Sequence, residues 1–219
     1  MAKVQQISAS AAADLVKDGM SVMVGGFMTC GTPEDLVDAI VEKGVKDLTI
    51  ICNDAGFPAK GVGKLIANGQ VKTIIASHVG LNPECGRLYS AGELELILVP
   101  QGTLAERVRS AGAGLGGFLT PTGVGTTVGE GKDVITIDGV EFLLEKPLKA
   151  DVALISGNLV DKVGNIKYRG ATRNFNPLMA TAAETVIVQA DSIVEAGAIG
   201  TENVETPGIF VDYIVGGGK

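Results

Sequence analysis

The sequence has no tryptophan, little aromatic content (4%) and no long hydrophobic segment. A membrane-spanning helix requires roughly 20 consecutive apolar residues, and no run in this chain approaches that length. The 18 lysines and arginines are scattered along the chain, and the net charge is −7. Because phosphate contacts need clustered basic side chains, this balance argues against nucleic acid as the main partner. We therefore expect neither a membrane nor a nucleic acid to bind this protein.

Cysteine and histidine are also sparse. Cys30, Cys52 and Cys85 form no C-x-x-C motif and are odd in number, and the amino-terminal residues show no basic region followed by an apolar one. We interpret the three cysteines as free thiols of a cytoplasmic protein. His78 is the only histidine, and the spacing supplies it with no partners, so a structural or loop-bracing histidine is favoured over a catalytic one. The sequence thus predicts no bound metal.

Several catalytic motifs are missing as well. The chain has no G-x-S-x-G elbow, no P-loop ending in GKS or GKT, and no H-E-x-x-H helix. These absences weaken hydrolase, kinase and zinc-protein interpretations. The string GAGLGG at 112–117 matches the dinucleotide fingerprint literally, but it follows an expected helix instead of a strand. We therefore reject dinucleotide binding there.

What the chain does contain is a regular alternation of short apolar runs and amphipathic segments. We expect strands over 20–24, 48–52, 71–77, 94–100, 151–156 and 185–190, and helices over 8–16, 33–43, 63–68, 87–91, 103–111 and 178–184. This alternation indicates βαβ units and a mostly parallel sheet. The predicted fold class is α/β, an open, mostly parallel sheet flanked by helices, in a single domain over residues 1–219.

The middle of the chain departs from this alternation. Residues 111–132 are glycine-rich and too long for an idle connection, so we expect a functional or interface loop. Residues 133–145 then read as two short strands about the Asp138-Gly139 turn, a strong hairpin signal. We therefore expect a small antiparallel hairpin added to the parallel sheet.

Local signals set the ends of two expected helices. Ser8 or Ser10 can cap the first. For the second, Thr32 is the expected N-cap with Pro33 at the first helical position, and Asp35 completes a variant capping box. A glycine at position 44 is expected to end that helix.

The turn GGFMTCG, Gly25 to Gly31, is the first candidate site. Gly25 and Gly26 lack a Cβ, so a ligand could approach the backbone closely, and either residue can adopt a positive φ. A helix N-terminus follows, with its partial positive charge. The turn could therefore hold a phosphate, a carboxylate or a transition-state oxyanion, or it could be a tight strand-to-helix turn without a ligand.

Two further candidates also follow expected strands. Gln101 stands where a strand ends and a helix begins, which is where ligands bind in open parallel sheets. Its amide could donate to an oxyanion, or it could cap and brace the loop. Asn53 and Asp54 could bind a substrate or form an Asx turn. The site thus has donors and a possible cradle, but no obvious activated nucleophile.

The segment DGMSVMVGGFMTCGTP resembles the signature of the family I CoA-transferases, the 3-oxoacid CoA-transferases. The pattern is satisfied without a gap by Asp18, Gly19, residues 22–24, Gly25, Gly26, Phe27, Gly31 and Pro33. The likeness continues through PQGTLAER, GAGLGGFLTPTGVGT, ADVALI, RNFNP and TPGIFVD. These motifs are most similar to α subunits of bacterial acetate– or butyrate–acetoacetate CoA-transferases. The resemblance implies a CoA-transferase/NagB-like fold.

The resemblance also implies a chemistry. Such enzymes move CoA between a thioester and a free carboxylate by a ping-pong route, through a glutamyl-CoA thioester. In two-subunit members the nucleophilic glutamate belongs to the β subunit, in a Ser-Glu-Asn-Gly motif that this chain lacks. Glu202, in GTEN, is rejected as a substitute because no glycine follows and it lies in the C-terminal segment of the chain. A β-subunit partner, in an α₂β₂ assembly, is therefore expected to supply the nucleophile.

The residues of the candidate sites acquire roles from the same resemblance. CoA or acyl-CoA, as a substrate and not a permanently bound cofactor, is expected to contact the turn formed by Gly25, Gly26, Phe27, Met28, Thr29, Cys30 and Gly31. Gln101 takes the position of the oxyanion donor, and Asn53 and Asp54 line the acyl site, where the extra charge of Asp54 should favour monocarboxylates over succinate. Residues 112–127 are assigned to the partner interface. The alternatives are an α subunit for succinate with a 3-oxoacid, or a non-catalytic acyl-CoA-binding module.

Overall fold

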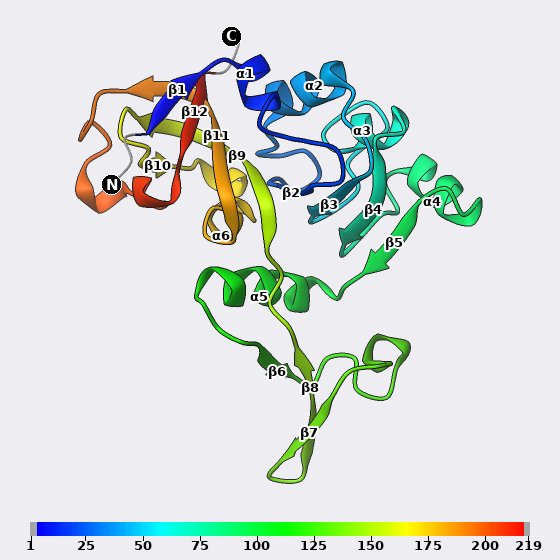
Figure 1. Ribbon diagram of the computed structural model, residues 1–219. Helices are drawn as coiled ribbons and strands as arrows, with labels where there is room; N and C mark the ends of the chain where they lie inside the picture. The colour runs from blue at the N-terminus through cyan, green and yellow to red at the C-terminus, as the bar shows by residue number, and fades with distance from the viewer. Residues whose placement is uncertain (1–3, 217–219) are drawn as a thin grey trace.

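The computed structural model describes residues 4–216. Within this range the main sheet has nine strands, in the order β1-β12-β11-β9-β2-β3-β4-β5, with β10 paired to β9 outside this path (Figure 1). The strands are β1 (Gln5–Ile7), β2 (Ser21–Val24), β3 (Leu48–Cys52), β4 (Val71–Ala76), β5 (Glu95–Leu98), β9 (Ala150–Asp161), β10 (Ile166–Lys167), β11 (Ala183–Val194) and β12 (Tyr213–Gly216). All neighbouring pairs are parallel except β9 with β10. The predicted mostly parallel sheet is confirmed.

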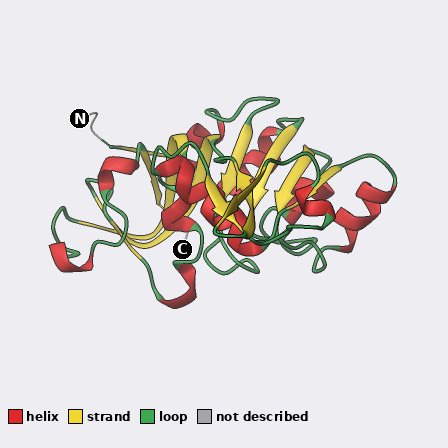
Figure 2. Ribbon diagram, turned by 90° about the horizontal axis from the view of Figure 1, so that it is seen from below, coloured by secondary structure: helices red, strands yellow, loops and turns green. Residues whose placement is uncertain are grey.

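Helices cover both faces of this sheet (Figures 1 and 2). They are α1 (Ala9–Ala13), α2 (Glu34–Lys43), α3 (Gly63–Ala67), α4 (Pro83–Ser90), α5 (Gln101–Gly112) and α6 (Asn176–Met179). Helices α1 to α4 pack on one face and α5 and α6 on the other. Among the described residues, no helix is long and apolar enough to cross a membrane.

The strand sequences divide their side chains between two cores. Successive side chains of a strand point to opposite faces, and apolar residues at consecutive positions therefore fill both layers. In β2, Val22 and Val24 join the core under α1 to α4, whereas Met23 joins the core under α5 and α6. Ile50 and Ile51 of β3 are divided in the same way. Burial on both faces explains why these strands read as continuous apolar runs.

A second, three-stranded antiparallel sheet projects from the end of α5 (Figure 1). It consists of β6 (Phe118–Thr120), β7 (Val134–Ile137) and β8 (Val140–Glu145), with β8 in the middle. The expected hairpin is confirmed: Asp138 and Gly139 form its turn with φ of 50° and 78°, the positive values that a two-residue hairpin turn requires. The glycine-rich stretch contributes the third strand, β6, which the sequence did not predict. We call residues 118–145 the arm.

Two predicted helix boundaries are confirmed. The Ser8 hydroxyl accepts a hydrogen bond from the Ala11 amide (3.1 Å) and caps α1. Gly44 ends α2 in the left-handed conformation, with φ of 72°.

The predicted capping box of α2 is wrong. Pro33, and not Thr32, is the N-cap residue, and the helix begins at Glu34. The cap comes from β11: Gln189 Oε1 accepts from the Asp35 amide (2.9 Å) and the Leu36 amide (3.3 Å). A distant side chain thus satisfies donors that the local sequence leaves open.

The helix expected over 178–184 is also wrong in extent. Helix α6 is one short turn that ends at Met179, and β11 begins at Ala183, where it pairs with Ala150 of β9. The Ala-rich segment favours a helix by propensity, but residues 180–182 form a turn, and from Ala183 the parallel pairing with β9 makes the chain part of the twelve-residue strand β11.

Candidate active site

The candidate site residues meet at the carboxyl edge of the main sheet. Asn53 follows β3 directly, Ser77 follows β4, and Gln101 opens α5 behind β5. Parallel strands place their carboxyl ends at one edge, and β3, β4 and β5 are neighbours in the sheet. The sequence therefore brings three polar side chains together from three successive loops.

Gln101 is held at both ends of its amide. Its Nε2 donates to Asn53 Oδ1 at 2.6 Å. The Ser77 hydroxyl donates to Gln101 Oε1 and also lies 2.8 Å from the Asn53 carbonyl oxygen. The Gln101 amide carries two N–H bonds, and one of them is not used by Asn53. A fixed amide at an exposed position can thus offer a hydrogen bond to an incoming oxygen.

Asp54 is buried beneath this edge, with 7% of its surface exposed. Its Oδ2 accepts from the Met28 amide at 2.8 Å and from Asn53 Nδ2 at 3.0 Å. Its Oδ1 accepts from the Gly56 amide at 3.0 Å. The last contact is the Asx turn considered from the sequence, while the first ties β3 to the glycine turn behind β2.

The glycine turn itself is a tight hairpin. Phe27 and Cys30 exchange both backbone hydrogen bonds (3.1 and 2.9 Å). Met28 and Thr29 between them have φ of 47° and 64°, a conformation that costs most non-glycine residues about 1 kcal/mol or more. Phe27 and Met28 expose 44% and 45% of their surface. The turn therefore presents apolar side chains from a strained backbone, which Asp54 holds in place.

The glycines of this turn give space to the chain's own residues. A Cβ on Gly25 would lie 1.8 Å from Asn176 Oδ1, and a Cβ on Gly26 would lie 2.0 Å from Thr32 Oγ1. Gly26 also adopts a φ of 120°, as the sequence allowed. The small size of Gly25 thus lets Asn176 approach, and that of Gly26 makes room for Thr32.

Two asparagines brace the turn from the other half of the sheet. Asn174 accepts from the Gly26 amide (3.1 Å) and donates to the Cys30 carbonyl (2.9 Å). Asn176 donates to the Gly31 carbonyl (3.0 Å) and accepts from the Ser156 amide (3.0 Å). Both belong to the RNFNP segment, which was noted in the sequence without a structural function.

A second turn with the pattern G-F-x-x-x-G lies beside the first. Residues 26–31 read GFMTCG and residues 56–61 read GFPAKG. Phe57 and Lys60 are bridged as Phe27 and Cys30 are. The Gly61 amide donates to Glu34 at the start of α2 (3.0 Å), and a Cβ on Gly61 would lie 3.3 Å from Thr29 Cγ2. The two turns thus pack together at the same edge; the sequence signal for the second was its repeated pattern.

The thiol of Cys52, the residue before Asn53, is not poised to react. Burial raises the pKa of Cys52 well above its ordinary value, and the neighbouring Asp54 carboxylate raises that pKa further. A neutral thiol is a poor nucleophile. Cys52 therefore serves the core under α1 to α4.

The remaining sequence candidates are His78, which directly follows Ser77, and Glu202. The backbone of His78 pairs with Asp54, and its carbonyl accepts from the Ala55 amide (3.1 Å), in agreement with a loop-bracing position. Glu202 is exposed in a short 3-10 turn over Thr201–Asn203. Within residues 4–216, no group of three or more His, Cys, Asp or Glu side chains could hold a metal ion.

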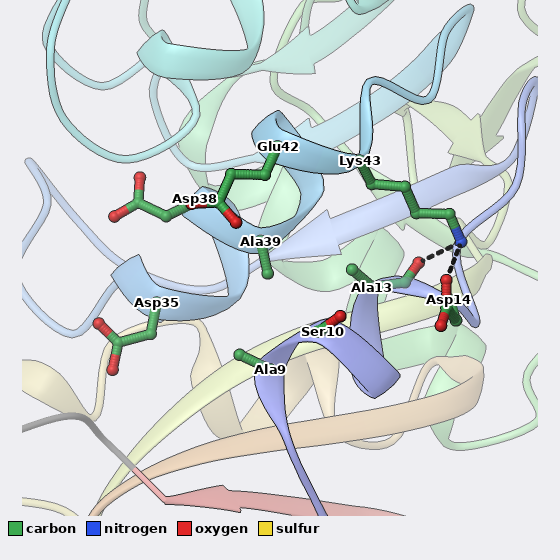
Figure 3. Close-up of a pocket in the computed structure, with 9 residues that line it drawn as sticks. All are labelled: Ala9, Ser10, Ala13, Asp14, Asp35, Asp38, Ala39, Glu42 and Lys43. Carbon is green, nitrogen blue, oxygen red and sulfur yellow. Dashed lines mark hydrogen bonds and ion pairs between the residues drawn. The ribbon is translucent and has the colours of Figure 1, made fainter.

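A hollow of about 450 Å³ between α1 and α2 lies away from this edge (Figure 3). Its lining includes four carboxylates, Asp14, Asp35, Asp38 and Glu42, and one lysine, Lys43, which pairs with Asp14 at 2.9 Å. An anionic ligand would be repelled there. The carboxyl edge is therefore the better candidate for an anionic substrate.

The chain matches the protein family described as Coenzyme A transferase over residues 6–217. It belongs to this CoA-transferase family. The family indicated by the sequence motifs is confirmed.

Two curated relatives cover nearly the whole chain. The acetate CoA-transferase subunit alpha of Escherichia coli (strain K12) is 54% identical over 199 residues, which are 91% of this chain and 90% of that protein. The acetoacetyl-CoA:acetate/butyrate CoA transferase alpha subunit of Clostridium acetobutylicum is 54% identical over 199 residues, 91% of each chain.

A crystal structure of an acyl-CoA transferase from E. coli O157:H7, in a thioester complex with CoA, has the same fold. The TM-score is 0.86 at 23% identity, over 98% of this chain and 47% of that one. The present chain thus spans about half the length of that acyl-CoA transferase. The expected CoA-transferase fold is confirmed.

Proposed function

We propose that this chain is the α subunit of a CoA-transferase that moves CoA between acetoacetyl-CoA, or another short-chain acyl-CoA, and acetate or butyrate. The names of the two 54% identical relatives support this substrate class. CoA and acyl-CoA would be substrates, and no permanently bound cofactor is needed. The free thiols Cys30, Cys52 and Cys85 agree with a cytoplasmic location.

The observation that carries the proposal is the Gln101 amide, fixed by Asn53 and Ser77 at the carboxyl edge. Attack on a thioester carbonyl develops negative charge on its oxygen, and an amide donor that is already oriented stabilises that charge without reorganisation. We propose Gln101 as this donor, with Asn53 as both its support and part of the acyl site.

We further propose that a β subunit supplies the nucleophile. Its glutamate carboxylate would attack the thioester carbon and expel the CoA thiolate, which leaves a mixed anhydride. The thiolate would then attack the glutamyl carbonyl of the anhydride, which forms the glutamyl-CoA thioester and releases the first carboxylate; the incoming acid reverses these steps. We still reject Glu202 as the nucleophile, because it is exposed in the 3-10 turn over Thr201–Asn203.

The turn over residues 25–31 is proposed to contact CoA. Its exposed Phe27 and Met28 offer apolar area to the pantetheine arm, and its strained backbone is kept in one conformation by Asp54 and Asn174. Preorganisation of this kind lowers the entropic cost of binding.

The partner interface is proposed to include residues 112–127 and the arm. Leu115 exposes 46% of its surface, and Val134, Ile137 and Val140 of the arm expose 46–51%. Exposed apolar side chains gathered in one region are typical of protein interfaces. An α₂β₂ assembly is the expected stoichiometry.

The preference for monocarboxylates needs a different physical basis from the one first considered. Asp54 was expected to repel a dicarboxylate such as succinate, but its carboxylate accepts three hydrogen bonds and is 7% exposed. The charge of Asp54 therefore acts mainly on the three hydrogen-bond donors of the protein around it, and not on a bound carboxylate. Acetate and butyrate are proposed on the strength of the relatives' names.

The test is CoA transfer from acetoacetyl-CoA to acetate, butyrate and succinate, with the purified chain alone and with its co-expressed β candidate. Activity only in the mixture, with borohydride trapping the thioester on the partner, supports the proposal. Activity from this chain alone would contradict it and direct attention back to Glu202. Binding of acyl-CoA without transfer in the mixture would instead favour a non-catalytic binding module.

A further inference from the structure

The carboxyl edge holds an unbroken series of side-chain hydrogen bonds that runs from Asp54 through Asn53 and Gln101 to Ser77. Asn53 Nδ2 donates to Asp54 Oδ2 (3.0 Å), and Asn53 Oδ1 accepts from Gln101 Nε2 (2.6 Å). Gln101 Oε1 in turn accepts from the Ser77 hydroxyl. Two amides, one carboxylate and one hydroxyl thus form a single chain across the ends of β3, β4 and β5.

The direction of this chain matters because each amide could be turned round. The oxygen and nitrogen of an amide are nearly equal in size, so packing alone does not choose between the two orientations; the hydrogen-bond partners do. If Gln101 were turned round, Oε1 would occupy the place of its N–H groups. An oxyanion donor would then become an acceptor that repels the developing charge.

One member of the chain has no such freedom. An ionised carboxylate can only accept hydrogen bonds, so Asn53 must present its NH₂ to Asp54 and its oxygen to Gln101. That oxygen requires the NH₂ of Gln101. Ser77 cannot impose this order, since a hydroxyl can donate or accept.

We infer that Asp54 is a positioning residue that fixes the donor orientation of Gln101 through the Asn53 amide. The inference rests on the proposed oxyanion role of Gln101 and deepens it. Asp54 Oδ2 is 2.8 Å from the Met28 amide and Oδ1 is 3.0 Å from the Gly56 amide, so the carboxylate is itself kept in place by two backbone donors. Its charge then orders the side chains that reach the substrate, and does not act on the substrate directly.

Asp54→Asn is the direct test because the asparagine side chain has nearly the shape of aspartate, but one of its two terminal atoms donates hydrogen bonds instead of accepting them. An asparagine has one acceptor oxygen for the three donors that face Asp54, so either orientation opposes NH₂ to an N–H group. When the NH₂ faces Asn53, the order of the whole chain reverses. We expect kcat to fall about tenfold, as for the loss of a buried hydrogen bond to a charged group.

The experiment measures kcat and KM for acetoacetyl-CoA in the assembled αβ transferase, for the wild type, D54N, Q101A and the double variant. If Asp54 acts through Gln101, D54N lowers kcat with little change in KM, and it costs nothing further once Gln101 is alanine, because coupled residues are not additive. D151N is the matched control: Asp151 also accepts from a backbone amide and a hydroxyl, both of Ser21, and has no contact with this chain of side chains, so kcat should stay unchanged.

Each other outcome is decisive. An equal loss of kcat from D54N in the wild-type and Q101A backgrounds overturns the inference and leaves the proposed function standing. A rise in KM with unchanged kcat would also overturn it, since Asp54 would then act on the turn through Met28. A Q101A enzyme with wild-type kcat would instead refute the oxyanion role itself. Thermal melting of every variant separates these effects from loss of the fold.

Discussion

The side-chain oxygen of Asn176 lies 1.8 Å from the position that a Cβ on Gly25 would take. Asn176 cannot retreat without cost, because the same oxygen accepts from the Ser156 amide and its NH₂ donates to Gly31. Two halves of the sheet therefore meet where only glycine fits.

Gly25→Ala should consequently destabilise the fold by about 3 kcal/mol, the range of an overpacked core position, and lower the melting temperature. Gly86→Ala is the matched control: it lies inside α4 with no atom within 4 Å of its would-be Cβ, and alanine is the better helix former by about 1 kcal/mol. Equal effects of the two substitutions would contradict the steric account.

Lys132→Met should loosen the arm. Lys132 Nζ lies 2.5 Å from Glu145 Oε1, and the Glu145 side chain is 2% exposed. Arg107 Nε is farther from the same carboxylate, at 3.9 Å from Oε2. Removal of the lysine leaves a buried carboxylate poorly paired, at a cost of about 2 kcal/mol. Hydrogen exchange of the β7 and β8 amides should accelerate more than that of the main sheet.

Lys162→Met provides the comparison for the arm. Lys162 pairs with Glu195, and both side chains are largely exposed, so the free energy of unfolding should change by less than about 0.5 kcal/mol. A similar loss from both lysine variants would show that burial of Glu145 does not matter.

Acid should weaken the junction of β2 and β9 through Asp151. Hydrogen bonds from the Ser21 hydroxyl and the Ser21 amide lower the pKa of Asp151 below its usual 3.8. The unfolded chain therefore binds the proton first as the pH falls. Stability from this carboxylate is complete above about pH 5 and is lost as the pH falls through the usual pKa and then the lowered one.

Urea midpoints from pH 5 down to pH 3 test this dependence. Asp151→Asn should flatten the acid side of the profile, and Ser21→Ala should flatten it partly, because the backbone donor remains. A wild-type profile that both variants reproduce would contradict the assignment.

Cys30 should be the thiol that reacts in the native protein. Cys30 is exposed, whereas Cys52 and Cys85 are buried and burial raises the pKa of each. A disulfide reagent should modify Cys30 rapidly and the other two only after unfolding. If residues 25–31 contact CoA, saturating CoA should slow the reaction in the assembled enzyme, and Cys30→Ser should abolish it.

Much of the parallel sheet could be predicted because its strands are buried on both faces. Runs such as LTIIC carry their own signal, and β3 is found at Leu48–Cys52 as expected. The helix ends at Ser8 and Gly44 could likewise be predicted, because each residue interacts with residues close to it in the sequence. The positions of Asn53 and Gln101 followed from the same logic, since each comes directly after a recognisable strand.

The rest depends on partners far away in sequence. Gln189 caps α2 from 154 residues away in the sequence. No local pattern reveals that Thr32 is not the N-cap residue of this helix. The chain turns at residues 180–182 and becomes a strand from Ala183 because β9 pairs with it there. Asn174 and Asn176 are likewise polar residues in a loop until the glycine turn is placed against them. Contacts of this kind are set by the assembled sheet.

The pairing of β1 with β12 has a consequence for how the chain reaches its native state. Gln5 lies beside Tyr213, and within residues 4–216 β12 is the only strand that pairs with β1. The β2 to β5 half is contiguous in sequence and can form from short-range contacts, which fold fast. Among the described strands of the main sheet, β1 is synthesised first and β12 last, so this edge of the sheet can close only after the other strands have been made.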